Sequence, residues 1–421
     1  MRGFVVGEDA NGIDMATVLI TGTCAEFSLA TGAELVTLMN EAAKCLWRVK
    51  TATGQCQGLI LVDRSLEAQA PWSSDGGNAS TPQLRHGEQL RRHHTYAALD
   101  LGTNNCRLLV ARPTGDGFRV IDAFSRIVRL GEGLGATGSL HVNAMSRAVD
   151  ALAVCAQKMR DRRVDRARLI ATEACRAADN GLLFIERVLR ETGLDLEIVD
   201  RETEARLAAA GCIPLIDRHL DGVVLFDIGG GSSEVVWLGI DPADSARQPS
   251  VRGWTSLPVG VVTLSERHGG VRVTHESFEK MVDDVDTMLA PFEHRAAIAA
   301  RVGRLHLLGT SGTVTTMAGI HLELPRYDRR RVDGLWMRDD EVDAVLEHLL
   351  EMTYEQRVAN ACIGPERADL VMAGCAIFEA IRRAFPCERL RVADRGLREG
   401  LLVQMMQEDR VWRRNGAGRQ P

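Results

Sequence analysis

The sequence predicts a mixed α/β fold built from two similar halves. From Tyr96 to about residue 412, apolar stretches of strand length alternate with stretches whose apolar residues recur at helical spacing. The same kind of series starts again after about residue 215. The chain has 421 residues, whereas single hydrophobic cores stop growing at roughly 250–300 residues. We therefore expect at least two lobes, each with its own sheet.

The elements of each half can be placed from the apolar pattern. In the first half we expect strands over 96–101, 106–111, 169–171 and 196–199, and helices near 143–160, 179–192 and 202–213. In the second half we expect strands over 223–228, 233–238 and 305–308, and helices near 275–290, 313–319, 339–351, 366–384 and 395–407. The corresponding domains are residues 96–215 and 216–412, and residues 413–421 are expected to fray.

The segment before Tyr96 has a different character. Residues 1–63 contain moderately apolar stretches without a convincing series of strands and helices. Residues 64–95 are rich in Ser, Gly, Gln and Arg and end in a basic run, so they carry too little apolar surface to fold. We expect residues 1–95 to form a poorly structured, largely disordered extension and linker, and we assign it no function.

Composition excludes several classes of protein. Hydrophobic residues make up 45% and charged residues 26% of the chain, which is typical of soluble globular proteins. No apolar run approaches the ~20 residues of a membrane-spanning helix, and no secretory signal precedes the fold, so we expect a cytoplasmic protein without a membrane partner. A net charge of −6 argues against a DNA or RNA partner. The ten scattered cysteines are expected to be buried apolar residues rather than zinc ligands or disulfides.

Each half opens on the same eleven-residue frame, residues 100–110 and 227–237. In both, an apolar strand ends on Asp, a Gly-rich turn follows, and a second apolar strand leaves the turn. Dinucleotide-binding and Walker loops place their glycines between a strand and a helix, so neither fits. We interpret the frame as a hairpin whose backbone N–H groups hold phosphate oxygens, with Asp100 or Asp227 available to Mg²⁺ or water. An ordinary Gly-rich hairpin is the alternative, although two in register make it less favoured.

A third glycine element spans residues 307–313 and runs from a strand into a helix expected to begin near Thr313. Backbone donors at the start of a helix, together with three hydroxyl groups, can bind an anion. A strand-to-helix loop with an ordinary Ser or Thr cap explains the same residues equally well.

Duplicated Asp-x-Gly turns joined by a later Gly-Thr loop resemble the actin-like ATPase superfamily. Within it, residues 96–410 closely resemble the exopolyphosphatase and guanosine-pentaphosphate phosphohydrolase family (Ppx/GppA), in its short two-domain form. The matching segments follow the family's order and are residues 98–104, 171–176, 204–207, 226–234, 256–260, 309–313, 367–369 and 394–400. The resemblance implies two ribonuclease-H-like lobes with a cleft between them. It also implies hydrolysis of terminal phosphoanhydride bonds in polyphosphate, guanosine pentaphosphate or both.

The resemblance also assigns catalytic residues. It matches Glu204 to the family's catalytic carboxylate, which would take a proton from the attacking water, although the helix dipole alone also favours an acidic residue there. Glu202 is the competing carboxylate. The dipeptide before this motif is Asp200-Arg201 rather than the Ser-Gly often found in the family. Arg176 matches an arginine that faces the cleft and can neutralise charge on a phosphate.

Ligands of phosphate and metal follow from the same matches. The phosphate-binding candidates are Gly102, Thr103, Asn104, Gly229, Gly230, Gly231, Ser232, Gly309, Thr310, Ser311 and Gly312. Asp227 is a catalytic candidate and, with Glu234 and Asp100, a candidate ligand of Mg²⁺ or another divalent metal. Glu234 could equally be an exposed strand residue. A run of arginines, Arg326, Arg329, Arg330 and Arg331, suits either a polyanion track or a solvated loop.

Two rival functions remain open at this level. A sugar or acetate kinase of the same superfamily would use similar turns but needs an adenine pocket and a phosphate acceptor. A regulator that senses guanosine tetraphosphate or pentaphosphate would bind without appreciable turnover. The sequence does not decide between polyphosphate and pentaphosphate, and it leaves open the chain-length preference and the oligomeric state, including a homodimer.

Overall fold

The computed structural model describes residues 94–115, 117–240, 249–301 and 303–412, together with the backbone of five strands between residues 2 and 61. The chain divides into two compact units, Met1–His86 and Gly87–Pro421. The predicted disorder of residues 1–95 and the predicted fraying of residues 413–421 fall mainly outside the described residues.

Five strands belong to the first unit. Strands β1 (Arg2–Glu8), β2 (Asp14–Ile20) and β3 (Thr23–Ser28) form an antiparallel sheet, and β4 (Leu46–Lys50) pairs with β5 (Cys56–Leu61). These strands were not expected, because the apolar stretches of residues 1–63 form no convincing series of strands and helices.

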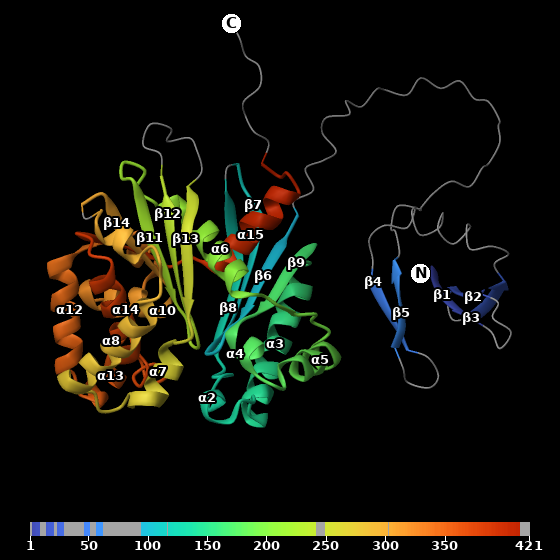
Figure 1. The fold of residues 1–421 in the computed structure, drawn as a ribbon, viewed down its shortest axis with the longest axis horizontal. Coiled ribbons are helices and arrows are strands. Elements are labelled where there is room, and N and C mark those ends of the chain that lie inside the picture. The colour runs from blue at the N-terminus through green and yellow to red at the C-terminus, as the bar shows by residue number, and fades with distance from the viewer. Residues whose placement is uncertain are drawn as a thin grey trace, which may run out of the picture. The chain divides into compact units, whose positions relative to one another are not determined.

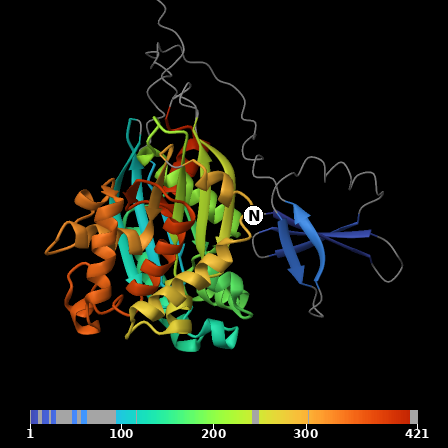
Figure 2. The ribbon, with the colours of Figure 1, turned by 60° about the vertical axis from the view of Figure 1, so that its left-hand side comes forward.

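The second unit contains two sheets. The sheet built from the earlier part of the sequence has the strand order β10-β9-β6-β7-β8. Helices α3 and α5 pack on this sheet through the apolar core that holds Leu99, Leu108 and Leu152. We call the sheet and these helices the first lobe (Figures 1 and 2). Its elements are β6 (Tyr96–Leu101), β7 (Asn105–Pro113), β8 (Phe118–Ile127), α2 (Leu134–Thr137), α3 (Val142–Asp161), β9 (Arg166–Ala171), α4 (Glu173–Ala177), α5 (Gly181–Thr192), β10 (Glu197–Ile198) and α6 (Arg201–Cys212).

The other sheet has the strand order β13-β12-β11-β14-β16-β15 and, with helices α8, α10, α12 and α14, forms the second lobe. Its elements are β11 (Gly222–Ile228), β12 (Ser233–Gly239), β13 (Ser250–Leu257), α7 (Val261–His268), α8 (His275–Leu289), α9 (Arg295–Ala299), β14 (Leu305–Thr310), α10 (Ser311–His321), α11 (Arg329–Val332), β15 (Trp336–Arg338), α12 (Asp339–Glu351), α13 (Tyr354–Ala359), α14 (Val371–Ala384), β16 (Arg389–Ala393) and α15 (Leu397–Glu408). The predicted α/β class with two similar sheets is confirmed.

The lobes exchange one helix each. Helix α6 follows the first sheet, yet Ala205, Ala209 and Cys212 share a core with β11 and β12 of the second sheet. Helix α15 follows the second sheet, yet Leu401 and Met405 share a core with β6, β7 and β9 of the first. Figure 1 shows both helices between the two sheets. The domain boundary near residue 215 stays a prediction. The contacts of α6 and α15 show that each of the two predicted domains supplies one helix to the sheet of the other.

Helices α6 and α15 cross at two glycines. A Cβ atom on Gly211 would lie 2.0 Å from the backbone oxygen of Gly396, and one on Gly400 would lie 2.0 Å from that of Leu207. Real Cβ atoms do not approach this closely, so only glycine permits the backbone contact at this crossing. The crossing fixes α6, which carries Glu204, against the last helix of the described chain.

Two further expectations concern the membrane and the cysteines. None of the helices in the described part of the chain is both long and apolar enough to cross a membrane. The seven cysteines whose side chains are described are buried and free, as predicted for apolar residues: Cys106, Cys155, Cys175, Cys212, Cys362, Cys375 and Cys387. The side chains of the other three cysteines lie outside the described residues.

Candidate active site

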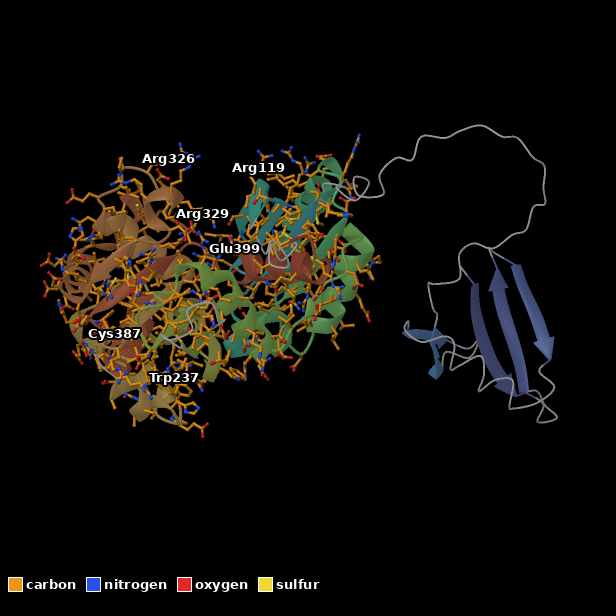
Figure 3. All side chains as sticks on the ribbon, turned by 90° about the horizontal axis from the view of Figure 1, so that it is seen from above. Arg119, Trp237, Arg326, Arg329, Cys387 and Glu399 are labelled. Atoms are coloured by element: carbon orange, nitrogen blue, oxygen red, sulfur yellow. The ribbon has the colours of Figure 1, made fainter. Side chains whose placement is uncertain are left out.

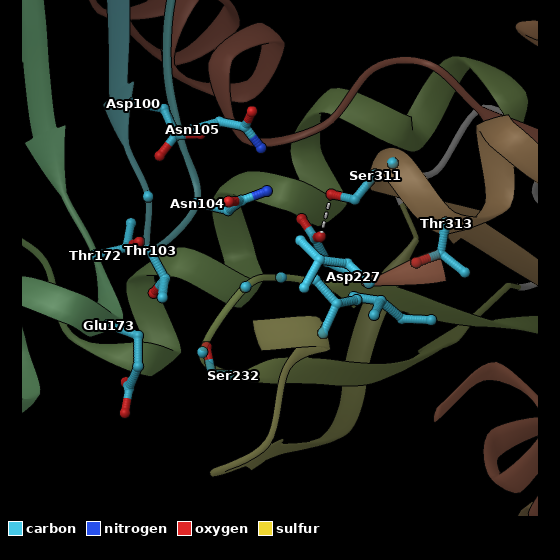
Figure 4. Close-up of a pocket in the computed structure, with 18 of the residues that line it drawn as sticks. Asp100, Thr103, Asn104, Asn105, Thr172, Glu173, Asp227, Ser232, Ser311 and Thr313 are labelled. Carbon is cyan, nitrogen blue, oxygen red and sulfur yellow. Dashed lines mark hydrogen bonds between the residues drawn. The ribbon is translucent and has the colours of Figure 1, made fainter. Parts of the chain in front are cut away.

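The two duplicated turns face each other across a cavity of about 120 Å³, the first cavity. The first turn joins β6 to β7, the second joins β11 to β12, and the start of α10 closes a third side (Figure 4). The predicted phosphate-binding residues that line it are Gly102, Thr103, Asn104, Gly229, Gly230, Gly231, Ser232, Ser311 and Gly312. Three glycine elements that are distant in the sequence therefore meet in one place.

Two predicted residues lie elsewhere. Gly309 is buried within β14, where a Cβ would lie 2.5 Å from the Phe226 ring, and it lines neither this cavity nor the neighbouring one. Thr310 lines the neighbouring cavity and donates to the backbone oxygen of Arg395 at 2.6 Å. The difference arises because α10 begins at Ser311, two residues earlier than predicted, so the strand extends through Thr310.

The two turns touch each other. A Cβ atom on Gly230 would lie 2.9 Å from Thr103 Cβ, and one on Gly231 would lie 2.7 Å from Thr103 Oγ1. Glycine at both positions lets the second turn close over the first without a side chain between them. The backbone N–H groups of both lobes can therefore approach one small anion.

A larger neighbouring cavity of about 560 Å³, the second cavity, shares Asp100, Arg107, Asp227 and Ser311 with the first. Its arginines are Arg107, Arg367, Arg395 and Arg398. Among the described residues, no ion pair within 4.0 Å is found for Arg107, Arg367 or Arg398, whereas Arg395 pairs with Asp333. The second cavity thus presents guanidinium groups that are open to a polyanion.

The predicted arginine run lies close to this cavity. Tyr327, which lines it, donates to Asp394 Oδ2 at 2.7 Å. Arg329 binds Glu399 at 2.9 Å (Figure 3), so its charge is already paired. Arg326, Arg330 and Arg331 are exposed. The choice between a polyanion track and a solvated loop stays open for these three.

Of the two competing glutamates, only Glu204 lines the first cavity. Both lie in the first turn of α6, whose N-cap Asp200 accepts a hydrogen bond from the backbone N of Thr203 at 2.7 Å. Glu202 is half-exposed and binds Arg206 at 2.5 Å. Because side chains two positions apart on a helix point in different directions, one carboxylate faces the cavity and the other faces solvent.

Arg176 holds Glu204. Both of its terminal nitrogens lie 3.2 Å from Glu204 Oε2, and Nη1 also donates to the backbone oxygen of Val199 at 2.6 Å. On its other side it donates to Glu173 from Nε at 3.0 Å and from Nη2 at 2.5 Å. Arg176 does not itself line either cavity. The structure therefore brings Arg176 and Glu204 together, although they are distant in the sequence.

Asp227 projects into the space between the lobes. Its Oδ1 accepts a hydrogen bond from Ser311 Oγ at 2.5 Å (Figure 4). Ser311 has a φ of 76°, in the left-handed region that non-glycine residues rarely adopt. Such conformations store on the order of 1–3 kcal/mol and are held in place by their surroundings. The strain is located at the residue that orients Asp227.

The carboxylates of the site raise one another's pKa. Burial, and then the nearby Glu234, raise the pKa of Glu204 well above its ordinary value, while Arg176 opposes the rise. Burial and Asp227 raise the pKa of Glu234 to about 7. Burial likewise raises the pKa of Asp100 and of Asp227. Carboxylates clustered in this way favour the protonation of one of them or the binding of a cation.

Replacing Glu234 with Gln should raise the melting temperature at pH 8, with a smaller gain near pH 5. The folded-state pKa of about 7 lies above the 4.5 of an ordinary glutamate, so the folded state holds the proton more tightly. Stability is therefore lost as pH rises between these two values, and the loss is complete above pH 7. Thermal melts of both proteins between pH 5 and pH 8 measure the change in melting temperature. Exposed Glu347, replaced in the same way, is the control for the loss of a surface carboxylate. A pH-independent gain for Glu234→Gln would contradict the assignment.

A divalent metal fits part of the predicted ligand set. Asp100 and Asp227 line the first cavity together with Asn104, whose Oδ1 is buried and has no hydrogen-bond donor. Glu234 lines neither cavity and accepts from Ser256 Oγ at 2.9 Å. No three acidic, His or Cys side chains of the described residues are close enough to form a metal site alone. Two carboxylates and an amide oxygen suit Mg²⁺, which keeps several waters and shares phosphate oxygens.

The predicted site omitted several residues that line the cavities, among them Arg107, which lines both, and four others. Thr172 and Glu173 line the first cavity, Arg398 lines the second, and Arg367 lines both. All four stand inside segments that carry the family resemblance, which was the available signal. Residue type alone could not separate them from ordinary surface polar residues.

Comparisons with known proteins identify the family of the chain. The model of the Ppx/GppA phosphatase family matches residues 109–409. Exopolyphosphatase 2 of Mycobacterium tuberculosis is 28% identical over 327 residues, which cover 73% of this chain and 98% of that protein. A guanosine-5'-triphosphate,3'-diphosphate pyrophosphatase of Photobacterium profundum is 27% identical over 328 residues, which cover 75% of this chain but only 60% of the relative's length.

A solved structure extends the comparison to the fold. The crystal structure of the Aquifex aeolicus member of the Ppx/GppA family is similar with a TM-score of 0.61 and 27% identity, covering 75% of this chain and 99% of that one. The likeness includes both lobes, since the family model spans nearly all of them. The chain belongs to the Ppx/GppA phosphatase family.

Proposed function

We propose that the chain hydrolyses the terminal phosphoanhydride bond of a polyphosphorylated substrate, either inorganic polyphosphate or guanosine pentaphosphate. The observation that carries the proposal is the position of Glu204 in the same small cavity as the two glycine turns. A terminal phosphate held by the turns would lie beside a carboxylate that can accept a proton from water. The relatives named as an exopolyphosphatase and as a pentaphosphate pyrophosphatase support this substrate class.

The proposed reaction is an in-line attack of water on the terminal phosphorus. Glu204 takes the proton as the oxygen–phosphorus bond forms, and the bridging oxygen leaves with the electrons of the broken bond. Backbone N–H groups of both turns stabilise the charge that develops on the phosphate oxygens, and Arg176 keeps Glu204 in position. Mg²⁺ held by Asp227 and Asp100 with the Asn104 amide would neutralise phosphate charge when bound.

The second cavity is where the rest of the substrate would lie. Arg107, Arg367 and Arg398 offer forked donors to the phosphates behind the terminal one. A longer polyphosphate chain and a nucleoside polyphosphate both meet this requirement, so both are proposed as substrates. We propose neither a nucleic acid nor a membrane as a partner. A cytoplasmic location is proposed on the basis of the free, buried cysteines, and a homodimer stays open.

The deciding experiment measures phosphate release from long polyphosphate and from guanosine pentaphosphate side by side, with and without Mg²⁺. Release from at least one substrate without added ADP is the expected result. A requirement for a phosphate acceptor would instead indicate a kinase. Tight binding of guanosine pentaphosphate without release of phosphate would indicate a nucleotide-sensing regulator, and either outcome would overturn the proposal.

A further inference from the structure

Arg201 is the first residue of α6 and directly follows its N-cap, Asp200. Its side chain reaches α4 of the same lobe. Nη2 donates to Glu173 Oε1 at 2.8 Å, and Nε lies 3.3 Å from Glu173 Oε2. The guanidinium thus binds both oxygens of one carboxylate, which fixes its orientation more firmly than a single contact would.

Glu173 is the centre of this arrangement. It is only 8% exposed, lines the first cavity and accepts hydrogen bonds from both Arg201 and Arg176. It also packs against the turn of the second lobe, because a Cβ on Gly231 would lie 3.1 Å from Glu173 Cγ. One carboxylate therefore contacts the arginine that holds Glu204 and the turn that would hold the phosphate.

The charges around Arg176 balance only when Arg201 is counted. Arg176 lies between two carboxylates, Glu173 and Glu204. Without Arg201, Arg176 alone would have to offset both carboxylates beside the first cavity. Arg201 supplies the second positive charge, so that two guanidinium groups face two carboxylates.

Exposure argues that this pair differs from an ordinary surface ion pair. The side chain of Arg201 is 41% exposed, but that of Glu173 is only 11% exposed, and that of Arg176 is 19% exposed. Exposed ion pairs contribute little to stability because water and salt screen them. Screening is weaker where one partner is buried, as Glu173 is. The charge of Arg201 therefore acts on the first cavity through the buried carboxylate of Glu173.

We infer that Arg201 is a positioning residue: by binding Glu173, which lines the first cavity, it fixes that carboxylate and offsets its negative charge beside the terminal phosphate of the substrate. The inference rests on the proposed function, since it assigns a role in binding the same phosphate.

Replacing Arg201 with Ala tests the inference through the split between KM and kcat. We expect KM for tripolyphosphate to rise roughly 10-fold, the size of a close charge coupling, with kcat within about 3-fold of the unsubstituted protein. A fraction of unfolded protein would lower the apparent kcat and leave KM unchanged, so the two explanations give different results. Thermal melts of each variant check folding directly.

Two further variants complete the experiment. The double variant Arg201→Ala/Glu173→Gln removes the excess negative charge and should restore KM to within about 3-fold of the original. Arg206→Ala removes the same charge from an exposed position of the same helix and should leave KM unchanged. The inference is overturned if Arg201→Ala behaves like Arg206→Ala, or if the double variant binds no better than the single one.

The inference stays testable if the proposed function fails. Should the unsubstituted protein release phosphate from neither substrate, calorimetric titration with tripolyphosphate replaces the kinetic measurement. Weaker binding by Arg201→Ala, restored in the double variant, would support the role of Arg201 without turnover. Equal binding by all four proteins would refute it, independently of the reaction.

Discussion

Replacing Glu204 with Gln is expected to lower kcat for phosphate release by roughly 10²–10⁴, the range for loss of a general base. The amide keeps the size of the side chain and can still contact Arg176, but it cannot accept a proton from water. Glu204 lines the first cavity beside both turns, so the loss should appear in kcat rather than in KM. Steady-state kinetics with polyphosphate and guanosine pentaphosphate measure it.

Glu202→Gln is the matched control for this prediction. Glu202 lies in the same helical turn, but it is half-exposed and paired with Arg206, so its replacement should leave kcat within about 2-fold of the original. An equal effect of the two substitutions, or an unchanged rate for Glu204→Gln, would remove Glu204 from the reaction. The raised pKa of Glu204 also predicts that activity falls as pH is lowered from neutrality, because only the ionised base accepts a proton.

Replacing Gly400 with Ala is expected to lower the free energy of unfolding by roughly 1–3 kcal/mol, the usual cost of overpacking. In an unconstrained helix the same change should be favourable by about 1 kcal/mol, since Ala is the better helix former. The added Cβ would lie 2.0 Å from the backbone oxygen of Leu207, so α6 and α15 must separate. Activity should fall as well, because α6 carries Glu204.

Urea unfolding followed by circular dichroism measures this change. Gly135→Ala is the control, since Gly135 lies in helix α2 and the nearest atom to an added Cβ is a Glu266 oxygen at 4.0 Å. That substitution should leave the free energy of unfolding unchanged or raise it by up to about 1 kcal/mol. Stability of Gly400→Ala at or above the original level would show that the two helices can move apart freely.

Most core strands could be predicted because their apolar residues are continuous, although the interior strand β16 was missed. Strands β6 and β11 are buried along almost their whole length, and in both the last residue but one is the Asp that precedes a glycine turn. Strands β8 and β13 were missed because they lie at the edges of their sheets and carry mostly exposed or half-exposed residues. An edge strand has fewer apolar positions, so its pattern resembles a polar loop.

The site was predictable in part for similar reasons. The glycine turns carry a local signal, because close backbone approach restricts the residue type. Arg176 and Glu204 were each assigned from the family resemblance, but their pairing was not predicted, since nothing local connects the two. The contact between Arg201 and Glu173 could not be foreseen, because it depends on how α6 is placed against α4. Three-dimensional placement, rather than residue identity, decides which of the many arginines act in the site.

The exchange of helices between the lobes has a consequence for the order of folding. The first sheet begins with β6 at Tyr96, but one of its apolar faces is covered by α15, which begins at Leu397. During synthesis, that face stays open to water and to other nascent chains until α15 has also been made. The first lobe therefore cannot bury this face until both sheets have been synthesised.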